Sequence, residues 1–163
     1  MDKKKAVKVS VLIVSALVIV LAGQDLEDWK SIGIYSGCGL LCRLTYQIHH
    51  ANMLHAFLNA WCLLSITFIY GISLCRLGLS YVISASVPSL FLSAIPTVGL
   101  SGVVFSLFGS ISFEVERKAY YQLWMLVYLA VGFLFPNTNA WLHLYCYMAG
   151  CAVALLNKPV KAV

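Results

Sequence analysis

Long hydrophobic runs separated by short polar breaks dominate the pattern along this chain. The breaks fall at residues 24–28, at Arg76, and at residues 96–99, 114–118 and 136–139. An apolar run of about 20 residues is long enough to cross the hydrocarbon core of a bilayer as a helix. The pattern predicts six spans, near residues 6–22, 48–70, 79–95, 100–113, 119–135 and 140–157. The expected fold class is an all-α polytopic membrane protein with a single domain, residues 1–163.

Composition and charge add a location and an orientation. Hydrophobic residues make up 61% of the chain and charged residues 10%, whereas soluble domains carry about 25% charge. Six spans place both termini on one side, with nine of the eleven Lys and Arg residues; the other side holds Lys30 and Arg43. Because cytoplasmic loops are enriched in basic residues, both termini are expected in the cytoplasm. We expect the cytoplasmic membrane of a cell, and a minimal six-span core is typical of a bacterial protein.

The first span has a second interpretation. Lysines at residues 3–8 precede an apolar run that ends in Leu21, Ala22 and Gly23, and this order is also typical of a cleaved signal peptide. Cleavage would leave five spans and keep the same loops inside. Because no strong Ala-x-Ala site follows, the pattern favours a retained helix.

The loop over residues 23–47 is external and mixes Gly, Leu, Tyr and Trp with few charges. We expect it to lie in the outer membrane interface. Cys38 and Cys42 both belong to it and are candidates for a disulfide in an oxidising compartment. The six cysteines form no Cys-x-x-Cys pair, which argues against a zinc ribbon.

Ser101 stands between Gly99 and Gly102 at the start of the short fourth span. Thirteen residues separate it from Glu114 at the cytoplasmic end, which is about 20 Å of helix in a core about 30 Å thick. Pro96 and Gly99 prevent the helix from extending upward, so Ser101 is expected about 10 Å below the outer surface. Non-helical backbone at that depth must be buried or line a cavity. The spacing predicts a cavity with Ser101 on its floor; the alternative is a serine that only caps a helix.

A nucleophilic serine needs a general base, and His143 is the one histidine outside the second span. It lies early in the sixth span, near the same outer face as Ser101. Small residues follow both positions, and such residues let membrane helices approach closely. The small residues are Gly102, Ser106 and Gly109 or Ser110 on one helix and Cys146, Gly150 and Ala154 on the other. Close approach would bring serine and histidine within hydrogen-bond distance; the alternative is an interfacial histidine beside Trp141.

No third catalytic group is evident. Asp25, Glu27 and Asp28 crowd at the end of the first span, and the acidic residues at 114 and 116 lie on the other side. The sequence therefore predicts a Ser–His dyad rather than a triad. Phe105, one helical turn after Ser101, is in position to stack on the imidazole, and packing alone explains it equally well.

Three motifs together resemble the rhomboid intramembrane serine proteases. They are His50, His55 and Asn59 in the second span, the sequence Gly-Leu-Ser-Gly at residues 99–102, and His143 early in the sixth span. The resemblance covers residues 43–154, nearly the whole chain. It implies a six-helix rhomboid-like bundle with a short, recessed fourth helix, a first loop lying on the membrane, and a fifth span that acts as a mobile substrate gate.

The resemblance also implies residue roles. Ser101 would be the nucleophile and His143 the general base, while His55, Asn59 and the backbone N–H of Ser101 would bind the oxyanion. The supporting residues would be His50 near the cavity mouth, Gly99, Gly102, Phe105 and Gly150. His49 would face the interface without a chemical role.

The chain departs from the family pattern at three places. Cys146 replaces a usual glycine, which predicts a slightly wider separation of the fourth and sixth helices. The Trp-Arg pair of the first loop is absent, and Phe105 replaces a common tyrosine. These differences concern efficiency or substrate preference, because both dyad residues are present.

The implied function is cleavage of single-span membrane proteins at or just below the extracytoplasmic surface. No cofactor, metal or nucleic acid is expected, and the substrate and oligomeric state are left open. One alternative is a catalytically silent rhomboid-like protein that binds or escorts membrane proteins; such relatives typically lack the serine or the histidine. Another is a metal site or transporter, against which His50 and His55 lie about 140° apart around a helix and no acidic residue occupies a later span.

Overall fold

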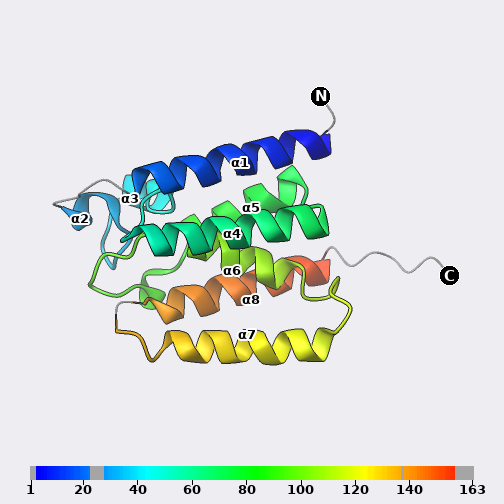
Figure 1. The fold of residues 1–163 in the computed structure, drawn as a ribbon. Coiled ribbons are helices and arrows are strands. Elements are labelled where there is room, and N and C mark those ends of the chain that lie inside the picture. Colours follow the sequence, from blue (N-terminus) through cyan, green and yellow to red (C-terminus); the bar gives the residue numbers. More distant parts are fainter. Residues whose placement is uncertain (1–2, 23–27, 137, 157–163) are drawn as a thin grey trace.

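The computed structural model describes residues 3–22, 28–136 and 138–156. Within these ranges the protein is all-helical, and the only β-type pairing is an isolated bridge between Ile34 and Thr97. Six longer helices run side by side along a common direction, and two short ones lie at one end (Figure 1). The elements are α1 (Lys3–Leu21), α2 (Trp29–Ile32), α3 (Leu40–Thr45), α4 (Met53–Tyr70), α5 (Leu74–Ala85), η1 (Ser89–Phe91), α6 (Ser101–Ser110), α7 (Lys118–Gly132) and α8 (Ala140–Leu156).

Helix α5 differs most from its predicted range, 79–95. It begins at Leu74, where the Ser73 side chain accepts a hydrogen bond from the Arg76 N–H (3.2 Å), and it ends at Ala85. Arg76 therefore lies inside the first turn instead of breaking the helix. Pro88 follows soon after the helix, and the apolar residues beyond it form a single 3-10 turn and a loop. Hydropathy predicted the apolar stretch but not its backbone conformation.

Helix α4 begins at Met53 rather than at residue 48. Asn52 caps it by accepting a hydrogen bond from the His55 N–H (2.8 Å), as asparagine commonly does at this position. His49 and His50 therefore precede the helix. The other four long helices begin and end within three residues of the predicted ranges.

Helix α6 is the centre of the fold. It packs against α4, α5 and α8, and nine of its ten residues are buried. Two apolar clusters meet on it: Leu107 belongs to the cluster shared with α1 and α4, and Phe105 to the cluster shared with α7 and α8. Ser101, at its N-terminus, is thus carried by the most enclosed element of the protein.

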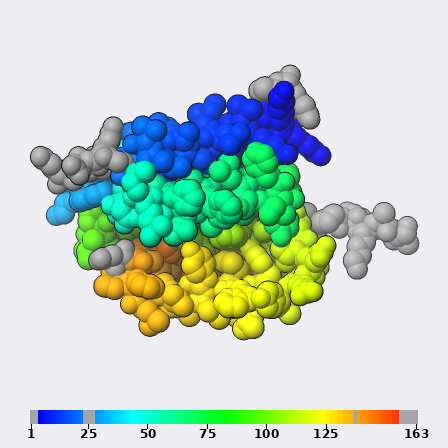
Figure 2. All heavy atoms as spheres, viewed as in Figure 1, coloured from blue at the N-terminus to red at the C-terminus, as the bar shows by residue number. Residues whose placement is uncertain are grey.

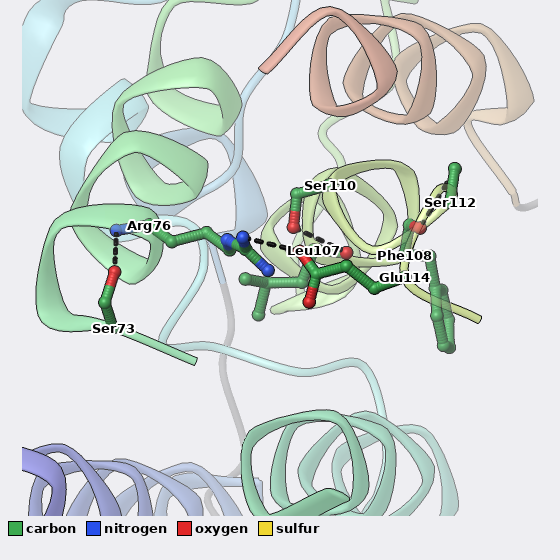
Figure 3. A network of polar contacts seen from close by, with 7 residues as sticks. All are labelled: Ser73, Arg76, Leu107, Phe108, Ser110, Ser112 and Glu114. Carbon is green, nitrogen blue, oxygen red and sulfur yellow. Dashed lines mark hydrogen bonds and ion pairs between the residues drawn. The ribbon is translucent and has the colours of Figure 1, made fainter. Parts of the chain in front are cut away.

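The end of the bundle opposite α2 and α3 carries most of the described basic residues. The N-termini of α1, α5 and α7 lie there (Figure 1), with Lys4, Lys5 and Lys8 on α1. Arg76 of α5 pairs with Glu114 after α6, with 2.6 Å between Nη2 and Oε1 (Figure 3). Lys158 and Lys161 lie outside the described residues.

Among the described helices, α4 is the one that meets the length and composition of a membrane span by itself. Large apolar side chains are nevertheless exposed around the bundle. They are concentrated on α1, α4 and α7, three helices that share the face shown in Figure 2. Examples are Ile13, Ile69, Leu123 and Leu126, each more than half exposed. The bundle is apolar on its outside as well as in its core.

Candidate active site

Ser101 and His143 come together at the start of two neighbouring helices. Ser101 Oγ and His143 Nε2 are 2.9 Å apart, within hydrogen-bond distance. Ser101 is buried, and His143 is partly buried in the first turn of α8. Asn139 defines that turn, since its Oδ1 accepts a hydrogen bond from the Leu142 N–H (3.1 Å). The sequence spacing predicts that Ser101 and His143 lie close together, and the structure confirms it.

Close packing of α6 on α8 holds the pair in place. A Cβ atom on Gly150 would collide with the Ser106 carbonyl oxygen, and one on Gly109 would collide with the Tyr147 carbonyl oxygen. The two backbones therefore touch one helical turn beyond Cys146, whose side chain is fully buried. A larger residue at either glycine would push the helices apart.

Gly102 faces a different neighbour from the one predicted. A Cβ atom there would collide with the Ser84 hydroxyl of α5 and lie 2.8 Å from the Tyr46 hydroxyl, and its nearest atom in α8 is Leu142 Cδ2 at 3.3 Å. The prediction that Gly102 belongs to the narrow α8 face was therefore wrong. One position along a helix rotates the side-chain direction by about 100°, which turns Gly102 toward α5.

Phe105 stacks on the imidazole of His143. The ring centroids are 4.4 Å apart and the planes differ by 15°. The phenyl ring is 4% exposed, so it also fills the core. The predicted stacking of Phe105 on the imidazole is therefore present, and the same ring also packs in the core.

The turn that precedes Ser101 requires a glycine. Gly99 has φ +127°, a conformation that L-residues with a side chain rarely adopt. A Cβ atom at Gly99 would also lie 2.7 Å from His55 Cε1. The Gly99 N–H donates to the Tyr46 carbonyl oxygen (3.0 Å). The turn is thus held by two residues that lie far away in the sequence, Tyr46 through a hydrogen bond and His55 through close packing.

His50 supports the same turn from behind. The Leu100 N–H donates to His50 Nε2 (3.1 Å), so this nitrogen carries no proton. The side chain is 2% exposed and does not line the cavity. The His50 ring lies next to that of His55, which does line the cavity, with 5.0 Å between the ring centroids. His50 is thus a buried neighbour of the site that supports it through the Leu100 N–H. His49 is half-buried and does not line the cavity either.

A cavity of about 280 Å³ lies between α4, α6, α7 and the start of α8. Ser101, His143, His55 and Asn59 all line it. Asn59 is six residues into α4, which is about 9 Å from the start of that helix, so the cavity floor is recessed below it. Asn59 Nδ2 donates to the His55 carbonyl oxygen (3.0 Å). An amide nitrogen has two N–H donors, which leaves one for a ligand.

Residues that the sequence did not single out also line the cavity. Cys62 lies on the α4 wall, and Tyr128, Val131 and Phe135 belong to α7 or follow it. Beyond Gln122, α7 is apolar or aromatic, so no polar side chain marks the face that lines the cavity. Only packing against α8 reveals it.

The other candidate groups lie elsewhere. The Cys38–Cys42 pair is not bonded, and all six cysteines carry free thiols. Asp28 caps α2 through the Lys30 N–H, while Asp25 and Glu27 lie outside the described residues. In the described part of the chain, no group of three or more His, Cys, Asp or Glu residues is placed to hold a metal ion.

The site therefore combines four chemical features in one cavity. A serine hydroxyl contacts an imidazole nitrogen, the serine opens a helix whose first N–H groups have no intrahelical acceptor, and an amide and a second imidazole stand opposite. Such donors stabilise a developing oxyanion, and a serine beside an unprotonated imidazole nitrogen is an activated nucleophile. In comparisons with known proteins, no family model and no curated protein matches this chain.

Proposed function

We propose that this protein is an intramembrane serine endopeptidase of the rhomboid type. It uses the Ser101–His143 dyad to cleave membrane-anchored proteins at or just below the extracytoplasmic surface. The observation that carries the proposal is the 2.9 Å contact between Ser101 Oγ and His143 Nε2, in a cavity that also contains His55 and Asn59. A serine that merely caps a helix does not require a histidine, an amide and a cavity around it.

The reaction follows from the atoms present. Ser101 Oγ attacks the scissile carbonyl carbon while His143 Nε2 accepts the hydroxyl proton. The imidazolium then gives this proton to the leaving amine as the C–N bond breaks, which leaves an acyl ester on Ser101. Water, deprotonated by His143, attacks the ester carbonyl; the bond between this carbon and Ser101 Oγ then breaks, the new C-terminal carboxyl product leaves, and the proton on His143 returns to Oγ. Each step needs only the two side chains and one water molecule.

The tetrahedral intermediates carry a negative oxygen that the cavity can bind. The remaining N–H of Asn59, a ring N–H of His55 and the backbone N–H of Ser101 supply the donors. The positive end of the α6 dipole adds to them, since α6 begins at Ser101. Donors held by rigid elements act without reorganisation during the reaction, and both α4 and α6 are regular helices here.

The membrane setting is supported by the outer surface. Monomers in water rarely expose large contiguous apolar patches, yet α1, α4 and α7 expose large apolar side chains along their length. We propose that the six long helices cross the bilayer as a rhomboid-like bundle. The basic end, with Lys4, Lys8 and Arg117, would be cytoplasmic, and the end with Ser101 and His143 would be extracytoplasmic.

Substrate access would occur between α4 and α7, the two helices that form the sides of the cavity. Only Met125 and Leu129 of α7 are buried, so this helix is weakly held and suited to act as a gate. A substrate helix that unwinds near the cleavage site would present its carbonyl to Ser101. Helix-weakening residues and a small residue before the scissile bond are expected in the substrate.

Cleavage of a reporter with one transmembrane segment, reconstituted with the purified protein in vesicles, tests the proposal. Ser101→Ala and His143→Ala are expected to abolish cleavage. Ser106→Ala is the matched control, because Ser106 is a buried serine on the same helix and lies outside the cavity. Cleavage by Ser101→Ala at the parent's rate would contradict the proposal.

A further inference from the structure

We propose that Tyr128 is a positioning residue, which couples the placement of α7 to the orientation of the His143 imidazole through the ring of Phe105. This inference rests on the proposed function. It adds a link between the helix that admits substrate and the base that activates the nucleophile.

Three rings form a nearly parallel series from α7 to the dyad. Tyr128 stacks on Phe105 with 5.3 Å between centroids and 18° between planes. Phe105 stacks on His143 with 4.4 Å and 15°. Phe105 is the shared partner, and its other described ring contact is an edge-on one with Phe108 at 6.1 Å. Offset parallel stacking of this kind is a favourable arrangement for aromatic rings.

The imidazole has few other restraints. Among the described residues, its one side-chain hydrogen bond is that to Ser101, and no carboxylate holds its second nitrogen. Ring orientation in catalytic histidines is usually fixed by a hydrogen bond on the far nitrogen. Here stacking on the face of Phe105 replaces such a hydrogen bond, so the orientation of the imidazole plane depends on the orientation of the phenyl ring.

Among the described residues, the side-chain hydrogen bonds that join α7 to α6 and α8 lie near the N-terminus of α7, while Met125 and Leu129 hold the middle of the helix by apolar packing. The Tyr121 hydroxyl donates to the Phe108 carbonyl oxygen (2.7 Å), and the Tyr147 hydroxyl donates to Gln122 Oε1 (2.5 Å). Both contacts lie in the first two turns of α7. Tyr128 lies further along the helix, is 53% exposed and forms part of the cavity wall. Beyond it, Phe133 contacts Trp141 edge-on, with 5.1 Å between ring centroids.

A movement of α7 away from the cavity would therefore change the alignment of the Ser101–His143 dyad. If the outer half of α7 moves away while Tyr121 and Gln122 stay bonded, the Tyr128 ring leaves Phe105. Phe105 then loses one of its two stacked partners, and the imidazole loses a fixed plane against which to align. The aligned base and the closed α7 thus belong to the same state, and the open state that admits substrate has a less well oriented base.

The test compares Tyr128→Leu with Tyr128→Phe, which keeps the ring, and with Tyr120→Leu, which removes an exposed ring at the start of the same helix. The readout is the rate constant of inactivation by a small fluorophosphonate, because such a probe reports on the dyad rather than on docking of a substrate helix. Tyr128→Leu is expected to lower this rate constant by about three- to tenfold, the scale of one stacked aromatic pair. Tyr128→Phe and Tyr120→Leu are expected to match the parent.

A double variant sharpens the test. Phe105→Leu alone is expected to slow inactivation, and adding Tyr128→Leu to it is expected to cause little further loss, because the two rings act as a unit. If Tyr128 were only a wall of the cavity, Tyr128→Leu would raise the KM of the reporter and leave the phosphonate rate unchanged. That outcome would overturn the inference while leaving the proposed function intact.

A second measurement separates the inference from the proposed function. If the parent reacts with no phosphonate and cleaves no reporter, the proposed function fails. The coupling is then read from the NMR signals of the carbon-bound ring protons of His143, which the face of Phe105 shifts upfield. These signals are expected to move in Phe105→Leu and, in the same direction, in Tyr128→Leu. Signals that move in Phe105→Leu but stay unchanged in Tyr128→Leu would overturn the inference.

Discussion

Helices α6 and α7 line the same cavity but are held in opposite ways. Nine of the ten residues of α6 are buried, whereas two of the fifteen residues of α7 are buried. Helix α6 touches α8 backbone to backbone at Gly109 and Gly150. Helix α7 relies on a few aromatic contacts and two hydrogen bonds near its start. One helix carries Ser101, the proposed nucleophile, and the other borders the route by which a substrate would reach it.

The difference has a physical meaning for the proposed chemistry. A dyad works only if its atoms are held to within a fraction of an ångström, which needs packing on all sides. Access needs an element of low local stability, with few buried contacts. The protein divides these demands between two helices, and the following changes probe that division.

The largest expected effect among the supporting residues comes from the rigid α4 wall. Asn59→Ala is expected to lower turnover by about 10²-fold, the usual loss for one oxyanion donor, with little change in stability. Asn52→Ala is the control on the same helix. It removes the cap on the His55 N–H and is expected to lower the free energy of unfolding by about 1 kcal/mol with a much smaller loss of turnover. Equal turnover in Asn59→Ala and the parent would remove Asn59 from the site.

The contact between α6 and α8 is tested by Gly150→Ala. The added Cβ would collide with the Ser106 carbonyl oxygen, so we expect a loss of about 1–3 kcal/mol in the free energy of unfolding together with slower cleavage. Gly78→Ala is the matched control, because no atom lies within 4 Å of a Cβ there; it is expected to be neutral or stabilising by up to about 1 kcal/mol. Thermal unfolding in detergent measures both. A Gly150→Ala protein as stable as the parent would show that the close contact is unimportant.

The looseness of α7 is tested by Tyr147→Phe, which removes the hydrogen bond to Gln122. One such bond contributes about 0.5–1.5 kcal/mol, so the open state should become about two- to tenfold more populated. If opening limits the rate, reporter cleavage rises by a similar factor. Tyr145→Phe, on the same helix with its ring tilted on Phe91, is expected to have no effect. Slower cleavage in Tyr147→Phe would indicate that α7 must stay closed throughout.

The smallest effect is expected at the far end of α6. Arg76 and Glu114 form an ion pair whose side chains are 18% and 32% exposed (Figure 3). Such partly exposed pairs contribute at most about 1 kcal/mol. Arg76→Gln should lower the free energy of unfolding by no more than this, and the difference from the parent should shrink at about 1 M salt, where charges are screened within about 3 Å. A difference that is insensitive to salt would point to lost packing rather than lost charge.

Much of the geometry of the candidate site could be predicted from the sequence, because it depends on local rules. The distance from Ser101 to Glu114 predicts a short helix, and small residues four apart predict close approach to the helix of His143. The C-terminal end of α5 could not be predicted, because residues 86–95 continue the apolar stretch of the helix, and only Pro88 indicates that the helix has ended. The face of α7 that lines the cavity, including Tyr128, could not be predicted either, since α7 has no strongly polar side chain after Gln122 to orient it. Gly102 was placed on the wrong face because a single residue step separates the α5 side of α6 from the α8 side.

The proposed Ser101–His143 dyad is tested most directly by locating the site of covalent modification. The intact protein is treated with a fluorophosphonate in detergent micelles, and the adduct is located by mass spectrometry of the digested chain. We expect one adduct, on Ser101, that is lost in His143→Ala and retained in His49→Ala. An adduct that forms equally well without His143, or one on a different serine while Ser101 stays unmodified, would contradict the assignment of the dyad.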